Sequence, residues 1–163
     1  MKFIIKQKLF SITDKYIIEN EYGEKLYKAQ KILMSMFKKM KIYDIEDREL
    51  VYIKEKFMKI LPTYLIYMGG NQVATMKKDI SILKPRFTVE SIIGDYEVKG
   101  DILDINFTIE KAGETVARVK KHFPAIRDSY EVDIKEGASQ SLILAMVIII
   151  DDVVHNTEKE DDD

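Results

Sequence analysis

The chain has 163 residues, of which 46% are hydrophobic and 33% charged, a composition typical of one globular domain that buries its own core. Its 26 basic and 28 acidic side chains give a formal net charge of −2, so it lacks the basic excess typical of nucleic-acid-binding proteins. The absence of cysteine and the presence of only two histidines exclude disulfides, thiolate zinc sites and a histidine-built metal centre. We therefore expect no metal, no cofactor and a cytoplasmic location.

The N-terminus begins with apolar residues, but Lys6 and Lys8 interrupt them before the core of a signal peptide can form. The longest unbroken apolar run, Leu142–Ile150, has nine residues, whereas a helix needs roughly 20 to cross a bilayer. The sequence therefore predicts neither a secretion signal nor a transmembrane segment.

Four short segments predict β-hairpins. Gly70–Lys78 and Gly113–Lys121 share the pattern G-x-x-V-A-x-x-K-K, and weaker copies begin at Asp47 and Gly23. Each copy follows a short run of β-branched and aromatic residues and begins with a residue that tolerates positive φ, which is the pattern of strand, tight turn and strand. One hairpin is therefore expected to recur along the chain.

Further short strands are expected between the hairpins, among them Phe87–Ser91, Tyr96–Lys99 and Asp101–Ile105. In all, about a dozen strands precede residue 135, at a spacing typical of an antiparallel meander or barrel. The sequence has no glycine-rich phosphate loop and no strand–helix alternation, which argues against an α/β nucleotide-binding fold.

The segment from Ser139 to His155 breaks the β pattern. Its β-branched stretch Val147–Ile150 favours a strand, but its length of about 17 residues favours a helix. We predict a helix that begins at Ser139 or Ser141 and ends near Asn156. Because this helix is apolar on every side, it has to be buried all round.

A closed barrel of about a dozen strands is too wide for its own side chains to fill. A hydrophobic helix of roughly 25 Å, at about 1.5 Å per residue, would fill that space. The predicted fold is therefore all-β with one helix, a closed antiparallel barrel of about twelve strands around a central C-terminal helix, over residues 1–156. Residues 157–163 carry five acidic side chains, one lysine and no apolar residue, and are expected to be an acidic disordered tail.

Several motifs, in this order, resemble those of the LURP-one-related proteins. They run from Tyr16-x-Ile18 and Gly23 through Tyr43-Asp44-x-Glu46-Asp47, Gly70-x-x-Val73-Ala74-x-x-Lys77-Lys78, Gly113-x-x-Val116-Ala117 and Tyr130-x-Val132 to the helix Leu142–Asp151. The resemblance covers Met1 to about His155. That family is similar to the tubby C-terminal domain and the phospholipid scramblases, and it implies a twelve-stranded barrel that encloses a hydrophobic helix.

The resemblance implies little about activity. Tubby domains bind phosphoinositides and scramblases are linked to phospholipids, so the implied partner is an anionic phospholipid or a membrane surface. The LURP-one-related proteins themselves imply no established molecular activity. No tubby binding residue aligns individually with this chain, and the extra membrane segment of the scramblases has no counterpart in the sequence.

Basic residues lie on or near the two strongest hairpin copies. They are Lys77, Lys78, Lys84, Arg86, Lys120 and Lys121. If the two hairpins are neighbours, their lysine pairs form a basic rim that attracts phosphate headgroups, and each charge near an anionic surface contributes about 1 kcal/mol. The alternative is that these residues are solvated strand ends that prevent edge pairing.

The remaining polar residues predict structure rather than catalysis. Neither His122 nor His155 stands at a spacing typical of a nucleophile site. Asp151 and Asp152 close the apolar helix and are expected to accept hydrogen bonds at the barrel mouth or to pair with a rim lysine. We therefore expect a non-enzymatic protein that binds anionic phospholipid. A protein-interaction module without lipid affinity and an enzyme built from distant residues are the alternatives.

Overall fold

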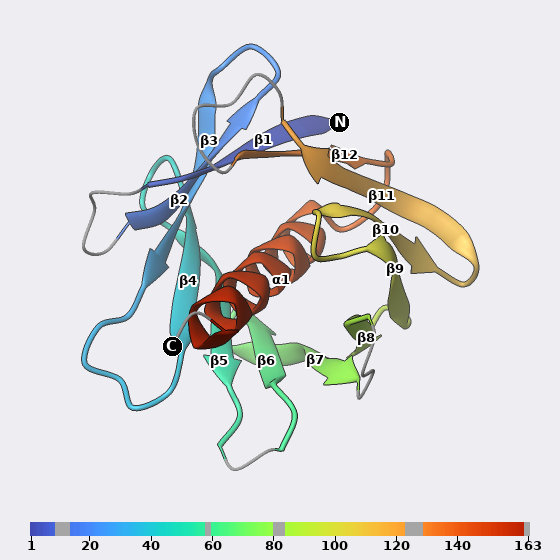
Figure 1. Cartoon of the computed structure of the whole chain (residues 1–163). Coiled ribbons are helices and arrows are strands. Elements are labelled where there is room, and N and C mark those ends of the chain that lie inside the picture. Colours follow the sequence, from blue (N-terminus) through green and yellow to red (C-terminus); the bar gives the residue numbers. More distant parts are fainter. Residues whose placement is uncertain (9–13, 58–59, 80–83, 123–128, 162–163) are drawn as a thin grey trace.

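The structure is a closed barrel of twelve antiparallel strands with one helix running through its interior (Figure 1). This computed structural model describes residues 1–8, 14–57, 60–79, 84–122 and 129–161, and for residue 14 and those after His155 it describes only the backbone. The predicted all-β barrel with a central C-terminal helix is therefore confirmed.

The strands are short and follow one another around the barrel. Their bounds are β1 Lys2–Gln7, β2 Asp14–Asn20, β3 Lys25–Lys31, β4 Lys39–Asp44, β5 Glu49–Glu55, β6 Thr63–Met68, β7 Asn71–Asp79, β8 Arg86–Ser91, β9 Tyr96–Asp101, β10 Asn106–Lys111, β11 Glu114–Lys121 and β12 Ser129–Ile134. Each pairs with the next along the chain, and β1 pairs with β12, from Lys2 opposite Asp133 to Lys6 opposite Ser129. This last pairing closes the barrel and leaves no exposed sheet edge.

The two ends of the barrel differ in which connections they carry. Because the strands alternate in direction, the connections that follow even-numbered strands all lie at one end, which we call the start end because the helix begins there after β12. The connections that follow odd-numbered strands lie at the other end, where the helix leaves the barrel, which we call the exit end.

The four predicted hairpins are present, and all of their turns lie at the start end. The residues at which the four copies begin, Gly23, Asp47, Gly70 and Gly113, have φ values of 82°, 61°, 80° and 78°, as tight hairpin turns require. One predicted strand is wrong. The segment Asp101–Ile105 leaves β9 after Asp101 and forms a turn, in which the Asp101 side chain accepts a hydrogen bond from the Asp104 amide at 3.2 Å.

The central helix α1 spans Gln140–Asp161. All of its side chains from Leu142 to Val154 are buried, which confirms the prediction that this segment is a helix buried all round and not a further strand. The helix continues five residues beyond the predicted end at Asn156, because a single asparagine does not stop a helix that polar, helix-compatible residues can extend. Its backbone therefore crosses the predicted boundary at residue 157.

Large side chains from the inner face of the wall pack around the helix. They include Phe3, Tyr16, Tyr64, Phe87, Tyr96 and Tyr130, all buried. Each strand alternates buried and more exposed positions, as in β4 and β8, because one face of the wall meets the helix and the other meets solvent. The helix thus occupies the interior that a ligand would otherwise need, and this directs binding to the rim or the outer face.

Candidate functional site

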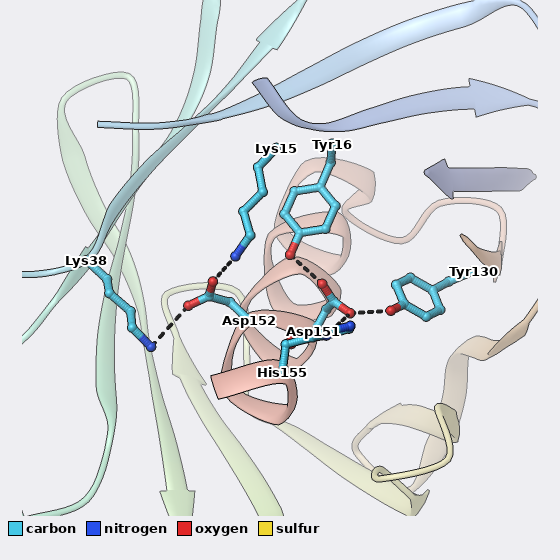
Figure 2. Close-up of polar contacts among 7 residues, drawn as sticks. All are labelled: Lys15, Tyr16, Lys38, Tyr130, Asp151, Asp152 and His155. Carbon is cyan, nitrogen blue, oxygen red and sulfur yellow. Dashed lines mark hydrogen bonds and ion pairs between the residues drawn. The ribbon is translucent and has the colours of Figure 1, made fainter. Parts of the chain in front are cut away.

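Polar side chains from three other parts of the chain converge on the helix where it reaches the exit end (Figure 2). Asp151 lies on the helix and is buried, and it accepts hydrogen bonds from the hydroxyl groups of Tyr16 on β2 and Tyr130 on β12. His155, one turn further along, places its Nδ1 atom 3.0 Å from a carboxylate oxygen of Asp151. Asp151 thereby joins the helix to the two strands that flank β1.

The neighbouring carboxylate joins the helix to β2 a second time and to the residue that precedes β4. Asp152 is also buried, and it pairs with Lys15 at the start of β2 and with Lys38, whose Nζ atom lies 3.2 Å from it. Figure 2 shows the two lysines reaching Asp152 from opposite sides. These contacts confirm the prediction that Asp151 and Asp152 accept hydrogen bonds at the mouth of the barrel or pair with lysines.

The surroundings shift the pKa values of these groups. Burial raises the pKa of Tyr16 well above its usual value, and the adjacent Asp151 carboxylate adds to this, so this tyrosine stays a hydrogen-bond donor. Burial by itself would raise the pKa of Asp152, but Lys15 and Lys38 outweigh it and hold that pKa below its usual value. Asp152 is therefore charged at neutral pH.

Among the described residues, one buried side-chain oxygen at this end has no hydrogen-bond partner. The side chain of Tyr64, at the start of β6, is 1% exposed, and its hydroxyl group makes no hydrogen bond among the described residues. Burial raises its pKa, and the negative charges of Glu55 and Asp152 raise it further. The hydroxyl group is thus neutral and lies within the electrostatic reach of both carboxylates.

This cluster fixes the position of the helix. A helix that is apolar on all sides has no polar contact to set its rotation or depth, whereas two adjacent carboxylates with different partners define both. Because the helix extends to Asp161, Asp151 and Asp152 lie well before its last turn, where the helix dipole would disfavour them. The arrangement is a structural lock, and we assign it no catalytic step.

The basic residues predicted as a binding site all lie at the exit end, but they do not form one cluster. Lys77 and Lys78 end β7, and Lys120 and Lys121 end β11. The strands β8, β9 and β10 stand between them in the barrel. The hairpins that carry the two lysine pairs are therefore not neighbours, because barrel closure places the β8–β9 hairpin between them.

Within each lysine pair, the two side chains belong to different faces of the wall. Lys78 lies opposite the buried Phe87, and Lys121 lies opposite the buried Tyr130. Both lysines therefore belong to the inner face of the wall, at the mouth of the barrel. Lys77 and Lys120 follow the outer face.

Lys120 already has a partner on that outer face. Its Nζ atom lies 3.3 Å from the carboxylate of Glu131, which also pairs with Lys2 at 3.2 Å. Burial would raise the pKa of Glu131, but the two lysines lower it. Lys120 is therefore less available to an external anion than its exposure suggests.

The other two predicted residues, Lys84 and Arg86, border a groove of about 1040 Å³ on the outer wall. The pairing of β8 with β9 runs only from Phe87 opposite Val98 to Val89 opposite Tyr96. Beyond these positions the two strands separate, and Pro85 has no amide hydrogen to extend the ladder. Acidic side chains line the groove as well. They are Asp79, Glu97 and Asp101.

The two histidines have local roles. His122 lies 3.8 Å from Glu131, and His155 contacts Asp151. Within the described ranges, no three side chains of metal-ligating type lie close enough to hold an ion.

Sequence reasoning missed the lysine and tyrosine partners of the helix. Tyr16 and Tyr130 belong to motifs of the resemblance, and Tyr64 belongs to the aromatic run that precedes the hairpin at Gly70, so the sequence predicts only strand positions for them. Lys15 and Lys38 belong to no motif. One signal was present: Lys15, Lys38 and Tyr64 each lie within one residue of the start of an even-numbered strand, which is the barrel end that the helix reaches. The closed topology was needed to use it.

The geometry can now be compared with known proteins. A model of the LURP-one-related family matches residues 1–151. The chain belongs to the LURP-one-related family. It is 27% identical to the uncharacterized protein YxjI of Bacillus subtilis, with 98% of each chain covered. It is also 24% identical to protein LURP-one-related 10 of Arabidopsis thaliana, over 97% of this chain and 91% of that one.

A solved structure of an Arabidopsis thaliana protein has the same fold. The two superpose with a TM-score of 0.69 at 16% sequence identity, over 93% of this chain and 91% of the other. The LURP-one-related barrel of unknown molecular function is thereby established for this chain. Among the residues that the structure describes, no helix is both long and apolar enough to cross a bilayer.

Proposed function

We propose that this LURP-one-related barrel is a non-enzymatic module that binds the phosphate headgroups of an anionic phospholipid surface through its exit end, as a cytoplasmic protein peripheral to the membrane. The bound species is then a surface rather than an enclosed molecule, because the helix fills the barrel. The headgroup contacts are assigned to Lys77, Lys78, Lys84, Arg86 and Lys121, with a smaller part for Lys120, which pairs with Glu131.

The observation that carries this proposal is the opposite charge of the two ends. In the described connections of the exit end, four side chains are basic and one is acidic. These are Lys8, Lys38, Lys56 and Lys84 against Asp104. In the connections of the start end, two are basic and six are acidic. These are Arg48 and Lys135 against Glu21, Glu24, Glu46, Asp47, Asp95 and Glu136.

Such polarity orients a protein on a charged surface, since a field of one sign attracts counter-charges and the other sign is repelled. A net charge of −2 for the whole chain conceals this arrangement. The helix backbone leaves the barrel at this basic end. The sequence after Asn156 carries five acidic side chains and one lysine, a charge that opposes the attraction.

The test is co-sedimentation with phosphatidylcholine vesicles that contain or lack phosphatidylserine. We expect binding only with phosphatidylserine. A variant with Lys77, Lys78, Lys120 and Lys121 all replaced by Glu should lose it, because each reversed charge removes about 1 kcal/mol of attraction and adds repulsion.

The matched control reverses Lys25, Lys111, Arg118 and Lys135, which lie toward the start end or at mid-wall and give the same net charge. It should bind as the unmodified chain does, or nearly so. Equal loss in both variants would show that net charge alone governs binding. Absence of binding by the unmodified chain would refute the proposal and favour the alternative, a protein-interaction module.

A further inference from the structure

Two connections at the exit end carry apolar side chains that the fold does not bury. In the β3–β4 connection, residues 32–38, Met34 is 105% exposed and Met36 is 88% exposed. In the β5–β6 connection, residues 56–62, Ile60 is 100% exposed, and Phe57 is also exposed. Large apolar side chains that are solvated together at one place mark an interaction surface.

These two connections form one surface. The rings of Phe37 and Phe57 lie 4.7 Å apart between centroids, so the connections contact each other. Backbone hydrogen bonds fix the base of the β3–β4 connection. The Ile32 amide donates to the Lys39 carbonyl oxygen at 2.9 Å, and the Glu55 amide donates to the Lys38 carbonyl oxygen at 2.9 Å. The exposed side chains of Met34, Met36 and Ile60 therefore lie on connections whose position relative to the barrel is fixed.

The fold does not require these residue types. Met34 has φ of 60°, a conformation that costs about 1–2 kcal/mol for a residue with a side chain and that glycine or asparagine would adopt more easily. A methionine that is both strained and fully solvated stabilises nothing within the chain. Its presence points to a contact outside the chain.

The basic side chains beside these two connections indicate what the exposed apolar residues contact. Lys39 on β4 and Lys54 on β5 lie directly opposite each other on the outer face, and like charges in that position destabilise a sheet. Among the described residues, no carboxylate pairs with either lysine. Lys31 and Lys56 flank the same two connections and are exposed. An anionic surface would relieve this repulsion.

We infer that Met34 and Met36 of the β3–β4 connection and Ile60 of the β5–β6 connection insert into the interfacial layer of an anionic bilayer, while Lys39 and Lys54 contact its phosphate groups. Apolar insertion beside basic side chains is the combination that gives lasting attachment at a membrane surface. The inference rests on the proposed function. It also specifies that the contiguous arc β3–β8 of the rim faces the bilayer most directly, with Lys120 and Lys121 at the margin of the contact.

The start end shows that exposure of an apolar side chain is not by itself sufficient to predict insertion into an anionic bilayer. Ile45 and Ile92 are also exposed there, but each lies at the tip of a tight turn, and acidic neighbours such as Glu46 and Asp95 stand beside them. An anionic bilayer repels those turns. These residues therefore provide matched controls.

The chain contains no tryptophan, so one introduced tryptophan reports its own environment. With vesicles that contain phosphatidylserine, the emission of Met36→Trp should shift to shorter wavelength and be strongly quenched by brominated acyl chains. The emission of Ile45→Trp should do neither. In sedimentation, the double variant Met36→Ser with Ile60→Ser should bind at least about tenfold more weakly, and Ile45→Ser with Ile92→Ser should bind as before.

The outcomes separate the two claims. If the unmodified chain sediments with acidic vesicles while Met36→Trp keeps a solvent-like, unquenched emission, the insertion is wrong and headgroup binding stands. If the unmodified chain does not bind acidic vesicles, the proposed function fails, and the insertion fails with it.

Discussion

The start end and the exit end of the barrel are made of the same strands but of different connections. At the start end, the four repeated hairpins have tight turns at positive φ, and the side chains around them are mainly acidic. At the exit end, the described connections carry four basic side chains and one acidic side chain, and large apolar side chains such as Met34, Met36 and Ile60 are exposed there. The difference indicates that the start end sets the strand register and that the exit end is available for interaction.

The exit end also contains the lock between helix and wall, which the start end lacks in the part that the structure describes. Asp151 and Asp152 reach strands β2 and β12 and the residue before β4 through four partners. Polar contacts that are buried are worth more than those on the surface, and they cost more to break. Changes at this end should therefore have larger effects on stability than similar changes at the other.

The largest effect is expected for Asp152→Ala. It leaves Lys15 and Lys38 without their shared anion in a partly buried place, and losing one partner of a buried ion pair costs about 3–5 kcal/mol. Urea denaturation measures the free energy of unfolding. The control Glu114→Ala breaks the exposed pair with Lys135 near the start end and should cost at most about 1 kcal/mol. Equal costs would contradict the lock.

A smaller effect is expected for Gly100→Ala, near the exit end of β9. Gly100 has φ of +123°, and an added Cβ atom would lie 2.7 Å from the Asn106 carbonyl oxygen and 2.9 Å from the Phe107 Cα atom. We expect a loss of about 2–3 kcal/mol. Gly70→Ala, at a start-end turn with φ of +80° and open space around it, should cost only about 1 kcal/mol. The two thermal unfolding midpoints compare them.

Two of the buried tyrosines near the lock, Tyr16 and Tyr64, should respond differently to loss of the hydroxyl group. Tyr16→Phe removes one of the two hydroxyl donors to the buried Asp151 carboxylate, so the chain should lose about 1–3 kcal/mol of stability. Tyr64→Phe removes a buried hydroxyl group that has no described partner and should be neutral or stabilising. A large loss for Tyr64→Phe would mean that its hydroxyl group has a bonded partner, such as an ordered water.

The smallest expected effect is on the acid side of the stability profile. The pKa of Asp152 is lower in the folded chain than in the unfolded one, so the unfolded state takes up the proton first as the pH falls. The stabilisation by Asp152 is therefore complete above its unfolded pKa of about 3.9 and is lost as the pH falls through the lower folded value. Between pH 5 and 2, the unfolding midpoint of Asp152→Asn should fall less steeply than that of the unmodified chain, and parallel curves would contradict this.

The sequence was most informative about local structure. The repeated turn residues predicted the hairpins, because a positive φ depends on the residue at that position. The uninterrupted run Leu142–Ile150 predicted a buried helix, because no one-sided surface could cover it. Even the role of Asp151 and Asp152 as mouth-facing acceptors followed from their place at the end of that run.

What the sequence could not predict depends on closure of the barrel. The separation of Lys78 from Lys121 depends on the order of β7 to β11 around the closed barrel. The local sequence around each lysine does not determine that order. The donors Tyr16 and Tyr130 are far from Asp151 in the chain, and Lys38 is far from Asp152. They meet only because the helix is threaded through the barrel (Figure 2). The turn after Asp101 was mistaken for a strand because its apolar residues Ile102 and Ile105 point into the core.

The most direct test of the account is the binding of the unmodified chain to phosphatidylcholine vesicles with and without phosphatidylserine, measured from low to physiological salt. We predict binding that requires the acidic lipid, weakens as salt screens the basic exit end, and persists in part at physiological salt because apolar side chains insert. Binding that is equal on neutral and acidic vesicles, or absent from both at low salt, would contradict it.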